Sequence, residues 1–507
     1  MKIKKFIAAG FAACLLLSAY SAPIGAVDVK SVTSGATVEL MSGSKQLSIK
    51  NCNSPAEAWN SAVSSTDRTG GTETVVTLGT DWEEDELLTV YTGQHITLDL
   101  NGHYVKRNRD HKMIRNGEVF RVNGEAVFTV RDSNPKSQGY DGINGGVITG
   151  GASSNTGGGV QIDEDGEFRL QSGTIYDCIT DEDGGAVYVS GSSMNTKFTM
   201  TGGRIYNCKT IDSADNCYGG AIYLNKGIVD ISNAKIDDCY SEDDGGAIYS
   251  ERGIIKLNNA IFSGNDAREQ GGAIYTALDT LKSQATQVIA HKCTFAGNTA
   301  KQDGGAVIIN DNPENNAAVV FHDCKFRNNS AGLKGGAVYI NDDNIALSSC
   351  EITGNSAVKE GGGIFVDQRY DITLKGKMII KDNTSSKGKG VSNLALDEGT
   401  LGTSYIINGG LYKDSEVHVG STSGSSERIS EWMSRYQTQY IIPDEGYLSY
   451  SDQRQVNSTM VVTSSIFSEG GFFAIVIIGG AGIIGVAILI IRKKRKEKAT
   501  EGGVEND

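Results

Sequence analysis

The chain has 507 residues, of which 64 are glycine and only 5 are proline, and its formal net charge is −14. The glycines follow no strict triplet, which excludes a collagen triple helix, and apolar residues spread along the whole length, which excludes a disordered chain. The negative charge also excludes nucleic acid as a partner, because an acidic body repels phosphates.

Residues 1–26 are predicted to be a secretory signal peptide. The basic residues Lys2, Lys4 and Lys5 precede an apolar run, Phe6 to Ala19, and small residues follow up to Ala26. This is the layout of a signal that is cleaved on export. We therefore expect the folded part of the chain to lie outside the cell.

Residues 27–92 are predicted to cap the N-terminal end of the fold. The run Ser54-Pro55-Ala56-Glu57 has the pattern of a capping box, in which a serine and a glutamate satisfy the free backbone N–H groups at a helix start. We expect a short helix through Val63 that covers the first coil of the domain. Such a cover is needed because a terminal coil otherwise presents unpaired backbone groups.

A repeated glycine doublet organises residues 93–403. In full form it reads Gly-Gly-Ala-Ile-Tyr, as at Gly219 to Tyr223, and it recurs with a base spacing of 26 residues plus insertions. A second block, such as Phe295 to Asn298, precedes each doublet, and the runs between the blocks alternate apolar with polar residues, as strands with one buried face do. Each repeat therefore predicts one coil of a parallel β-helix, stacked about 4.8 Å from the next. Asparagines predicted to lie in register at one corner are Asn265, Asn298, Asn329, Asn355 and Asn383.

These paired blocks resemble the repeats of chlamydial polymorphic membrane proteins, and the chain is similar to bacterial surface proteins with a pectate-lyase-like β-helix. The run Ile96 to His103 looks like the entry coil of the same kind of fold. The resemblance implies an all-β, right-handed parallel β-helix on a cell surface. It covers about residues 145–392 clearly and is far more specific for fold than for function.

Residues 404–471 are predicted to form an irregular C-terminal cap and membrane-proximal segment, and residues 472–491 a transmembrane helix. Phe472 to Ile491 is a run of 20 residues without charge, long enough to cross a hydrocarbon core of about 30 Å. The basic run Arg492 to Lys496 follows, so the tail 492–507 should stay in the cytoplasm. We therefore expect a single-pass protein of the cell membrane with a large extracellular N-terminal region, which meets the membrane through its own helix.

Aromatic residues recur at the fifth position of the doublet block. The fourth and sixth positions are mostly aliphatic and are expected to point inward, which sends the aromatic row outward. Two interpretations stay open: a ligand-binding track on which sugar rings stack, or a cross-strand ladder that stabilises the sheet. The row consists of Tyr188, Tyr223, Tyr249, Tyr275, Tyr339 and Phe365.

Two acidic runs precede doublets that lie two coils apart. Carboxylates that converge at a corner can bind calcium, whereas separated ones form an ordinary solvated turn. We expect that the protein requires no cofactor, and calcium is the candidate ion for this corner. The six histidines show no metal-ligand spacing. The carboxylates that would converge are Asp181, Asp183, Glu242 and Asp244.

Six cysteines fall on two ladders, at equal positions of successive repeats. A coil spacing of about 4.8 Å lies within the Cα separation that a disulfide spans, and export permits oxidation. Three thiols in a row cannot all pair within one ladder, so disulfides and stacked free thiols both stay open. The ladders are Cys178, Cys208 and Cys239, then Cys293, Cys324 and Cys350.

The predicted function is that of an adhesin-like surface protein that binds a polysaccharide or another cell's surface. No nucleophile, base or acid can be assigned from the sequence to a catalytic constellation, so catalysis is not favoured. One alternative is a polysaccharide lyase or glycoside hydrolase of pectate-lyase-like fold, which rests on analogy of fold. A second alternative is a passive surface stalk or envelope component.

Overall fold

The structure is a computed structural model. It describes residues 35–108, 111–211, 217–277, 286–310, 319–341, 345–367, 370–386, 392–399, 402–403, 406–421, 427–431, 440–444, 447–451, 460–464, 475–477 and 485–487. The predicted signal peptide (1–26) and cytoplasmic tail (492–507) lie outside the described residues.

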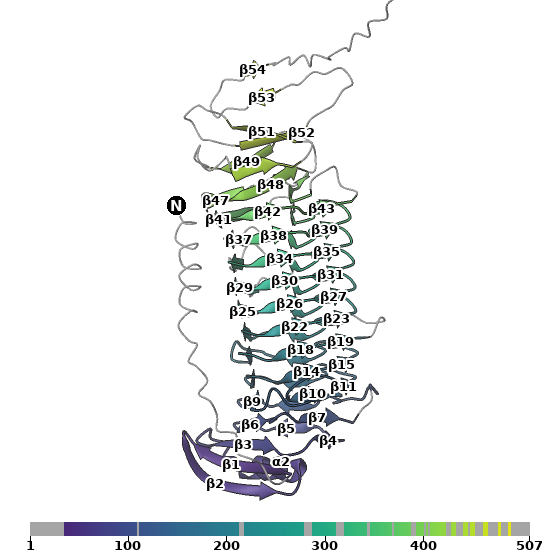
Figure 1. Cartoon of the computed structure of the whole chain (residues 1–507), viewed down its shortest axis with the longest axis vertical. Coiled ribbons are helices and arrows are strands. Elements are labelled where there is room, and N and C mark those ends of the chain that lie inside the picture. The colour runs from purple at the N-terminus through teal and green to yellow at the C-terminus, as the bar shows by residue number, and fades with distance from the viewer. Residues whose placement is uncertain are drawn as a thin grey trace, which may run out of the picture.

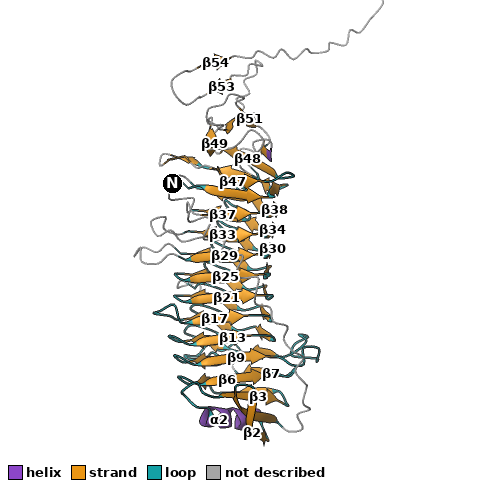
Figure 2. Cartoon of the chain, turned by 90° about the vertical axis from the view of Figure 1, so that its left-hand side faces the viewer, coloured by secondary structure: helices purple, strands orange, loops and turns teal. Residues whose placement is uncertain are grey.

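The described coils stack along one axis and form a long rod (Figure 1). Short strands lie across this axis, with the only described helix at the N-terminal end of the rod and the later strands at the opposite end (Figure 2). Between the two ends, successive coils pair in parallel. The prediction of an all-β parallel β-helix is therefore confirmed.

An N-terminal cap closes the first coil. Strand β1 (Ala36–Ser42) pairs antiparallel with β2 (Lys45–Cys52) and with β3 (Glu73–Leu78). Helix α2 (Pro55–Ser65) begins with the predicted capping box: Glu57 N donates to Ser54 Oγ at 3.2 Å, and Asn53 N donates to Glu57 Oε2 at 2.9 Å. The helix buries Trp59, whose ring lies 5.7 Å from that of Phe120 and 5.9 Å from that of Phe128. The indole thus covers the open apolar end of the helix interior.

Each complete coil contributes strands to three parallel sheets. Sheet A runs from the cap to the C-terminal end through β3, β6 (His95–Asp99), β9 (Val127–Arg131), β13 (Glu167–Leu170), β17 (Lys197–Met200), β21 (Ile228–Ser232), β25 (Ile254–Asn258), β29 (Gln287–His291), β33 (Val319–His322), β37 (Ile345–Ser348), β41 (Ile372–Gly376) and β47 (Ile406–Leu411). The short sheet C contains nine two-residue strands: β11 (Ala152–Ser153), β15 (Ile179–Thr180), β19 (Lys209–Thr210), β23 (Tyr240–Ser241), β27 (Asp266–Ala267), β31 (Thr299–Ala300), β35 (Ser330–Ala331), β39 (Ser356–Ala357) and β43 (Thr384–Ser385).

Sheet B consists of two stacks that β48 (Glu416–Ser421) joins at the C-terminal end, before β50 (Ile441–Pro443). The first stack contains β4 (Trp82–Glu84), β7 (Tyr104–Arg107), β10 (Val147–Thr149), β14 (Thr174–Tyr176), β18 (Arg204–Tyr206), β22 (Lys235–Asp237), β26 (Ile261–Ser263), β30 (Thr294–Ala296), β34 (Lys325–Arg327), β38 (Glu351–Thr353) and β42 (Ile379–Lys381). The second, here the doublet stack, contains β5 (Leu88–Val90), β8 (Phe120–Val122), β12 (Val160–Ile162), β16 (Val187–Val189), β20 (Ile222–Leu224), β24 (Ile248–Ser250), β28 (Ile274–Thr276), β32 (Val307–Ile309), β36 (Val338–Ile340), β40 (Ile364–Val366) and β44 (Leu394–Leu396).

The strand register matches the alignment of the repeats. Tyr223 pairs with Tyr249 in the doublet stack, and Phe262 pairs with Phe295 in the first stack. The glycine doublet makes the corner before each doublet strand: Gly245 has φ +70°, and a Cβ on Gly246 would lie 2.3 Å from the carbonyl oxygen of Gly272 on the next coil. Any side chain at the second glycine would therefore push adjacent coils apart.

Buried asparagines form the predicted ladder at the corner between the first stack and sheet C. Each side-chain amide donates to the carboxamide oxygen of the asparagine one coil further on, at 2.9 Å from Asn265 to Asn298 and at 2.8 Å from Asn329 to Asn355. The ladder ends at Asp444, whose carboxylate accepts from Asn393 Nδ2 at 2.6 Å. A fixed period thus lets each coil satisfy the buried turn of its neighbour.

The described part of the predicted transmembrane segment differs from the sequence prediction. In the part of the chain that the structure describes, no helix has both the length and the apolar character needed to cross a membrane. Of the predicted transmembrane helix at 472–491, only β53 (Ile475–Ile477) and β54 (Gly485–Ala487) are described, and they pair antiparallel. These six residues are strand, because the hairpin pairs the backbone groups of an apolar segment with one another.

Parallel pairing also extends beyond the predicted limits of the β-helix, 93–403. It begins between β3 and β6 and continues to β48 and β50. The remaining described strands are β45 (Glu398–Gly399), β46 (Gly402–Thr403), β49 (Glu427–Glu431), β51 (Tyr447–Ser451) and β52 (Met460–Ser464), and all of their pairs except β47 with β49 are antiparallel.

Candidate functional site

The aromatic row of the doublet stack points away from the core. Tyr223, Tyr249 and Tyr275 form a cluster of their own with Ile308, whereas Ile222 and Leu224 lie in the main core. Rings from Tyr188 to Tyr275 are nearly parallel, with centroids 5.1 to 5.3 Å apart. Outward orientation is therefore as expected for these tyrosines.

The flat faces of these rings are occupied. Tyr223 is only 4% exposed, and Tyr249 and Tyr275 are 8% exposed. Tyr218 adds a further ring 4.3 Å from Tyr249. The geometry favours the ladder interpretation over stacking on sugars, since the rings already stack on one another along the row.

Hydrogen bonds hold several of these hydroxyl groups at the edge of the row. Tyr223 Oη donates to Glu251 Oε1 at 2.6 Å, and Tyr339 Oη donates to Asp367 Oδ2 at 2.6 Å. Phe365 differs, because it is fully buried in the main core cluster and Lys334 Nζ lies 4.0 Å from its ring centroid. A ligand at this row would meet ring edges and carboxylates.

The acidic corner is built from repeated turn contacts. Asp183 accepts a hydrogen bond from Tyr218 N at 2.9 Å, and Asp244 accepts one from Gln270 N at 2.9 Å. Burial raises the pKa of each of these two carboxyl groups to about 7. Each carboxylate thus connects its own coil to the next one.

The other members of the predicted calcium site have separate surroundings. Glu242 accepts from Tyr240 Oη at 2.6 Å and forms an ion pair with Arg268. Among the described residues, Asp181, Asp183, Glu242 and Asp244 are not part of any group of three or more potential ligands within metal-binding distance. A calcium site at this corner stays a prediction.

All eight described cysteines are buried free thiols. The ladder positions are in register, and burial raises the pKa of Cys208, Cys239 and Cys324 above the usual thiol range. Such thiols are poor nucleophiles near neutral pH, because little thiolate is present. Cys178, Cys208 and Cys239 fill the core at the position that asparagine occupies in later coils. The other ladder lies two residues before a buried apolar residue of the first stack; its members are Cys293, Cys324 and Cys350.

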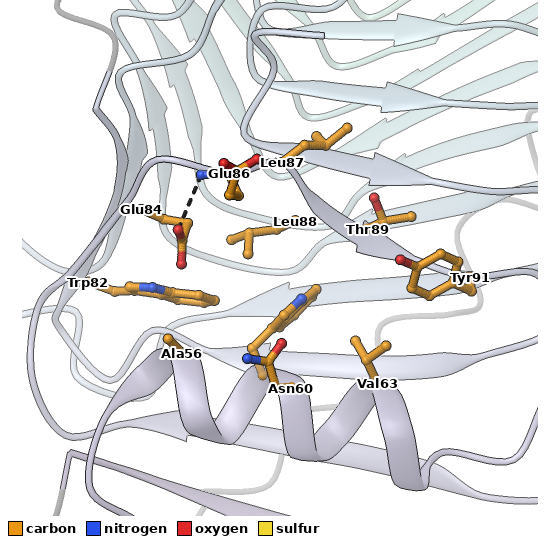
Figure 3. A pocket seen from close by; sticks show the side chains of 11 residues that line it. Ala56, Asn60, Val63, Trp82, Glu84, Glu86, Leu87, Leu88, Thr89 and Tyr91 are labelled. Atoms are coloured by element: carbon orange, nitrogen blue, oxygen red, sulfur yellow. Dashed lines mark hydrogen bonds between the residues drawn. The ribbon is translucent and has the colours of Figure 1, made fainter.

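A cavity of about 260 Å³ lies between helix α2 and the segment that connects β4 to β5 (Figure 3). Trp59, Trp82 and Leu88 form its buried wall. The two indole rings are 5.9 Å apart and tilted by 52°. Trp82 Nε1 is buried and has no hydrogen-bond partner among the described residues, so one donor beside the cavity is unsatisfied.

The rim of this cap pocket carries polar groups. Asn60, Glu86 and Tyr91 are exposed, and Glu84 is half-buried. A tight turn fixes the carboxylate of Glu84. Its Oε1 accepts from Asp85 N at 2.9 Å and from Glu86 N at 3.2 Å, the bond drawn in Figure 3. The pocket therefore combines aromatic surface with carboxylate and amide groups, the combination that suits a sugar ring.

The sequence prediction did not include this pocket. Its residues come from the helix, from β4 and from β5, so no local motif contains them. A signal was nevertheless present, because two of the three tryptophans of the chain fall within the cap region.

Two segments of the chain, residues 259–277 and 323–341, match the family model of the Chlamydia polymorphic membrane protein repeat. Each match runs from the corner after sheet A, through a ladder asparagine, to a doublet strand. No curated protein and no solved structure matches the chain. The chain thus contains parallel β-helix coils that resemble these repeats, which suggests a protein of the cell surface.

Proposed function

We propose that this chain is an adhesin-like surface rod that binds a glycan, on a polysaccharide or another cell, in the cap pocket. The observation that carries the proposal is the cavity of about 260 Å³ with two tryptophans in its wall and polar groups at its rim. Pockets for drug-sized ligands measure about 300–1,000 Å³, so this one suits a single small ring.

The position of the pocket supports this role. The cap closes the N-terminal end of the rod, and the sequence predicts a membrane anchor at 472–491, near the other end of the chain. With this anchor in the membrane and the C-terminus in the cytoplasm, the cap pocket would be the part of the rod farthest from the cell. A terminal position suits contact with another surface.

The chemistry of the pocket suggests how a sugar binds. The apolar face of the sugar would pack against the indole wall, and its hydroxyl groups would donate to Glu84 and Glu86 or accept from Asn60. The tyrosine row is a second candidate surface, through its ring edges and the carboxylates beside them. We do not propose the enzyme alternative, because two carboxylates that could act as acids, Asp183 and Asp244, accept hydrogen bonds from backbone groups of neighbouring coils.

The test is binding of the full-length chain, purified in detergent, to a glycan array. Tyr91→Ala and Asn60→Ala change exposed rim residues and should weaken binding about tenfold or more without unfolding the cap. Glu83→Gln is the matched control, because Glu83 is exposed and alternates with the pocket residues Trp82 and Glu84 on β4.

The outcomes separate the candidate functions. Loss of binding in the rim variants, with binding kept in the control, supports the cap pocket. Loss in Tyr188→Ala alone would move the site to the tyrosine row. If the parent chain bound no glycan and no cell surface, the passive surface stalk would be the remaining candidate function.

A further inference from the structure

Two histidines and one aspartate meet on the outer face of sheet A. His291 ends β29 and His322 ends β33, and the two residues pair on adjacent coils. In β29 the buried Val288 and Ala290 alternate with half-buried residues, so His291 points outward. Asp323 follows His322 at a corner with φ +54°. This His-His-Asp cluster lies on the coils between the two ends of the rod and is separate from the cap pocket.

The distances in the cluster suit a metal ion. One ligand atom from each residue lies within 4.8 Å of the others. Asp323 Oδ2 is 3.7 Å from His291 Nε2 and 3.1 Å from His322 Nδ1. A tetrahedral zinc site with bonds of about 2.0–2.1 Å needs ligand separations of about 3.3–3.4 Å. These two distances bracket this value.

The surroundings leave the correct nitrogen atoms free for a metal. His291 Nδ1 faces Asn258 Oδ1 at 3.1 Å, on the preceding coil. Donation of the Nδ1 proton to this amide oxygen leaves the lone pair of Nε2 directed at the cluster, the arrangement that outer partners impose on metal-bound histidines. His322 Nδ1 is buried and makes no hydrogen bond to any described residue, although Asp323 Oδ2 lies 3.1 Å away.

Charged side chains flank the cluster. Lys292, next in the chain, works against a bound cation, whereas the carboxylate of Asp323 favours it. Half-buried Ile289 and buried Val320 pack together on the same outer face.

We propose that His291, His322 and Asp323 bind one zinc ion that joins two adjacent coils. Two imidazoles and one carboxylate are ligands that zinc prefers over calcium, which favours oxygen atoms alone. Three protein ligands leave one position for water. The proposed site is independent of the proposed glycan binding.

Neighbouring coils supply matched substitutions for this test. The position of His291 is occupied by Asn258 on the preceding coil, and the position of His322 by Ser348 on the following coil. The corner position of Asp323 is occupied by Asn259 with φ +51°. His291→Asn, His322→Ser and Asp323→Asn should therefore keep the fold while they remove ligands.

The experiment is calorimetric titration of the full-length chain, without a polyhistidine tag, with zinc chloride. The parent should bind one zinc ion at this cluster, and its melting temperature should rise with zinc. The double variant His291→Asn/His322→Ser should lose this binding, and Asp323→Asn should weaken zinc binding at least about tenfold. Asn258→Ala removes the partner of His291 Nδ1 and should also weaken zinc binding about tenfold or more. Cobalt should give the visible absorption of a tetrahedral site in the parent alone.

The control is His418→Asn, which changes a histidine beside Glu416 and should leave zinc affinity unchanged. The proposal is overturned if the folded parent does not bind zinc, or if the double variant binds it as tightly as the parent. Equal heats with calcium and zinc would also overturn it, because they would indicate carboxylate sites elsewhere on the acidic surface.

Repeat alignment would have revealed this cluster. Read singly along the sequence, the six histidines show no ligand spacing. Aligned by coil, His291-Lys292-Cys293 and His322-Asp323-Cys324 fall at equal positions, so the stack brings the imidazoles together.

Discussion

Asp183 and Asp244 occupy the same position in two repeat units, immediately before a glycine doublet. Asp244 is buried and Asp183 is half-buried, and each accepts a backbone hydrogen bond from the next coil. Desolvation is the main cause that raises the pKa of each to about 7. A carboxylate in such a turn serves as an acceptor at the cost of being charged in a poorly solvated place.

We predict that these carboxyl groups make the fold less stable at alkaline pH. Their folded pKa of about 7 exceeds the usual carboxyl value of 3.8, so the folded state holds protons that the unfolded state releases. Stability from this source is complete below about pH 4, falls as pH rises and is lost above about pH 7. Asp183→Asn/Asp244→Asn keeps the acceptors without the charge.

The measurement is the melting temperature of parent and double variant between pH 4 and 8. The variant should match the parent near pH 4 and exceed it at pH 8, by at least about 1 kcal/mol in unfolding free energy. Asp230→Asn, on the outer face of β21, is the control. An identical difference at both pH values would contradict the prediction.

Asn298 tests the ladder at a single residue. It is fully buried, donates to Phe262 O at 3.1 Å and to Asn329 Oδ1 at 2.9 Å, and accepts from Asn265 Nδ2 at 2.9 Å. Asn298→Ala leaves several of these groups without partners, at about 1–3 kcal/mol each. We expect a loss of about 3 kcal/mol or more in denaturant unfolding. Ser263→Ala, which is half-buried in β26, should change little.

At the scale of single elements, the tyrosine row illustrates how one position becomes a structural unit. Coil spacing sets the ring spacing, since the paired Tyr223, Tyr249 and Tyr275 have centroids 5.1 to 5.3 Å apart. Stacked rings bury area on the outside of the doublet stack, where no core covers them. The row therefore stabilises the outer face as the apolar residues stabilise the inner one.

We predict that Tyr249→Phe is nearly neutral and that Tyr249→Ala costs about 3 kcal/mol or more. Phenylalanine keeps the stacking with both neighbours, whereas alanine leaves a gap between Tyr223 and Tyr275. Unfolding in denaturant measures both effects. If Tyr249→Ala left stability unchanged but abolished glycan binding, the row would be the binding surface after all.

The thiol ladders make a second prediction about elements. Because all eight described cysteines are free and buried, a maleimide reagent should label none of them quickly in the native chain and all eight in denaturant without reductant. Mass spectrometry counts the labels. Each disulfide would remove two labels from the count in denaturant, so fewer than eight labels would contradict the prediction.

At the scale of the whole molecule, the sequence predicted those features that recur in every repeat. The 26-residue period determines which residues pair, so the sheets, the asparagine ladder and the tyrosine row followed from alignment alone. The cap pocket did not follow, because Trp59 and Trp82 belong to elements outside the repeat. The His-His-Asp cluster was missed for another reason: His291 and His322 meet only across coils.

The same modularity predicts that one whole coil can be removed. Deletion of residues 249–274 takes out β25, β26 and β27 and joins Ile248 to Tyr275, each already at its own position in the doublet strand. The new neighbours then pair as the old ones did, with Cys239 facing Asn298 as it now faces Asn265. Because each coil contacts mainly its neighbours, stability should fall by only the contribution of one coil.

Deletion of residues 249–261 is the matched control, because it removes half a period and sets strands of different sheets against one another. We expect the 249–274 deletion to keep a cooperative transition and a β-rich circular dichroism spectrum. Its rod should be shorter by about 4.8 Å, while the control should aggregate or unfold. Small-angle scattering measures the length. If both deletions were equally disruptive, coils would depend on contacts beyond their immediate neighbours, and the rod could not be treated as a stack of interchangeable units.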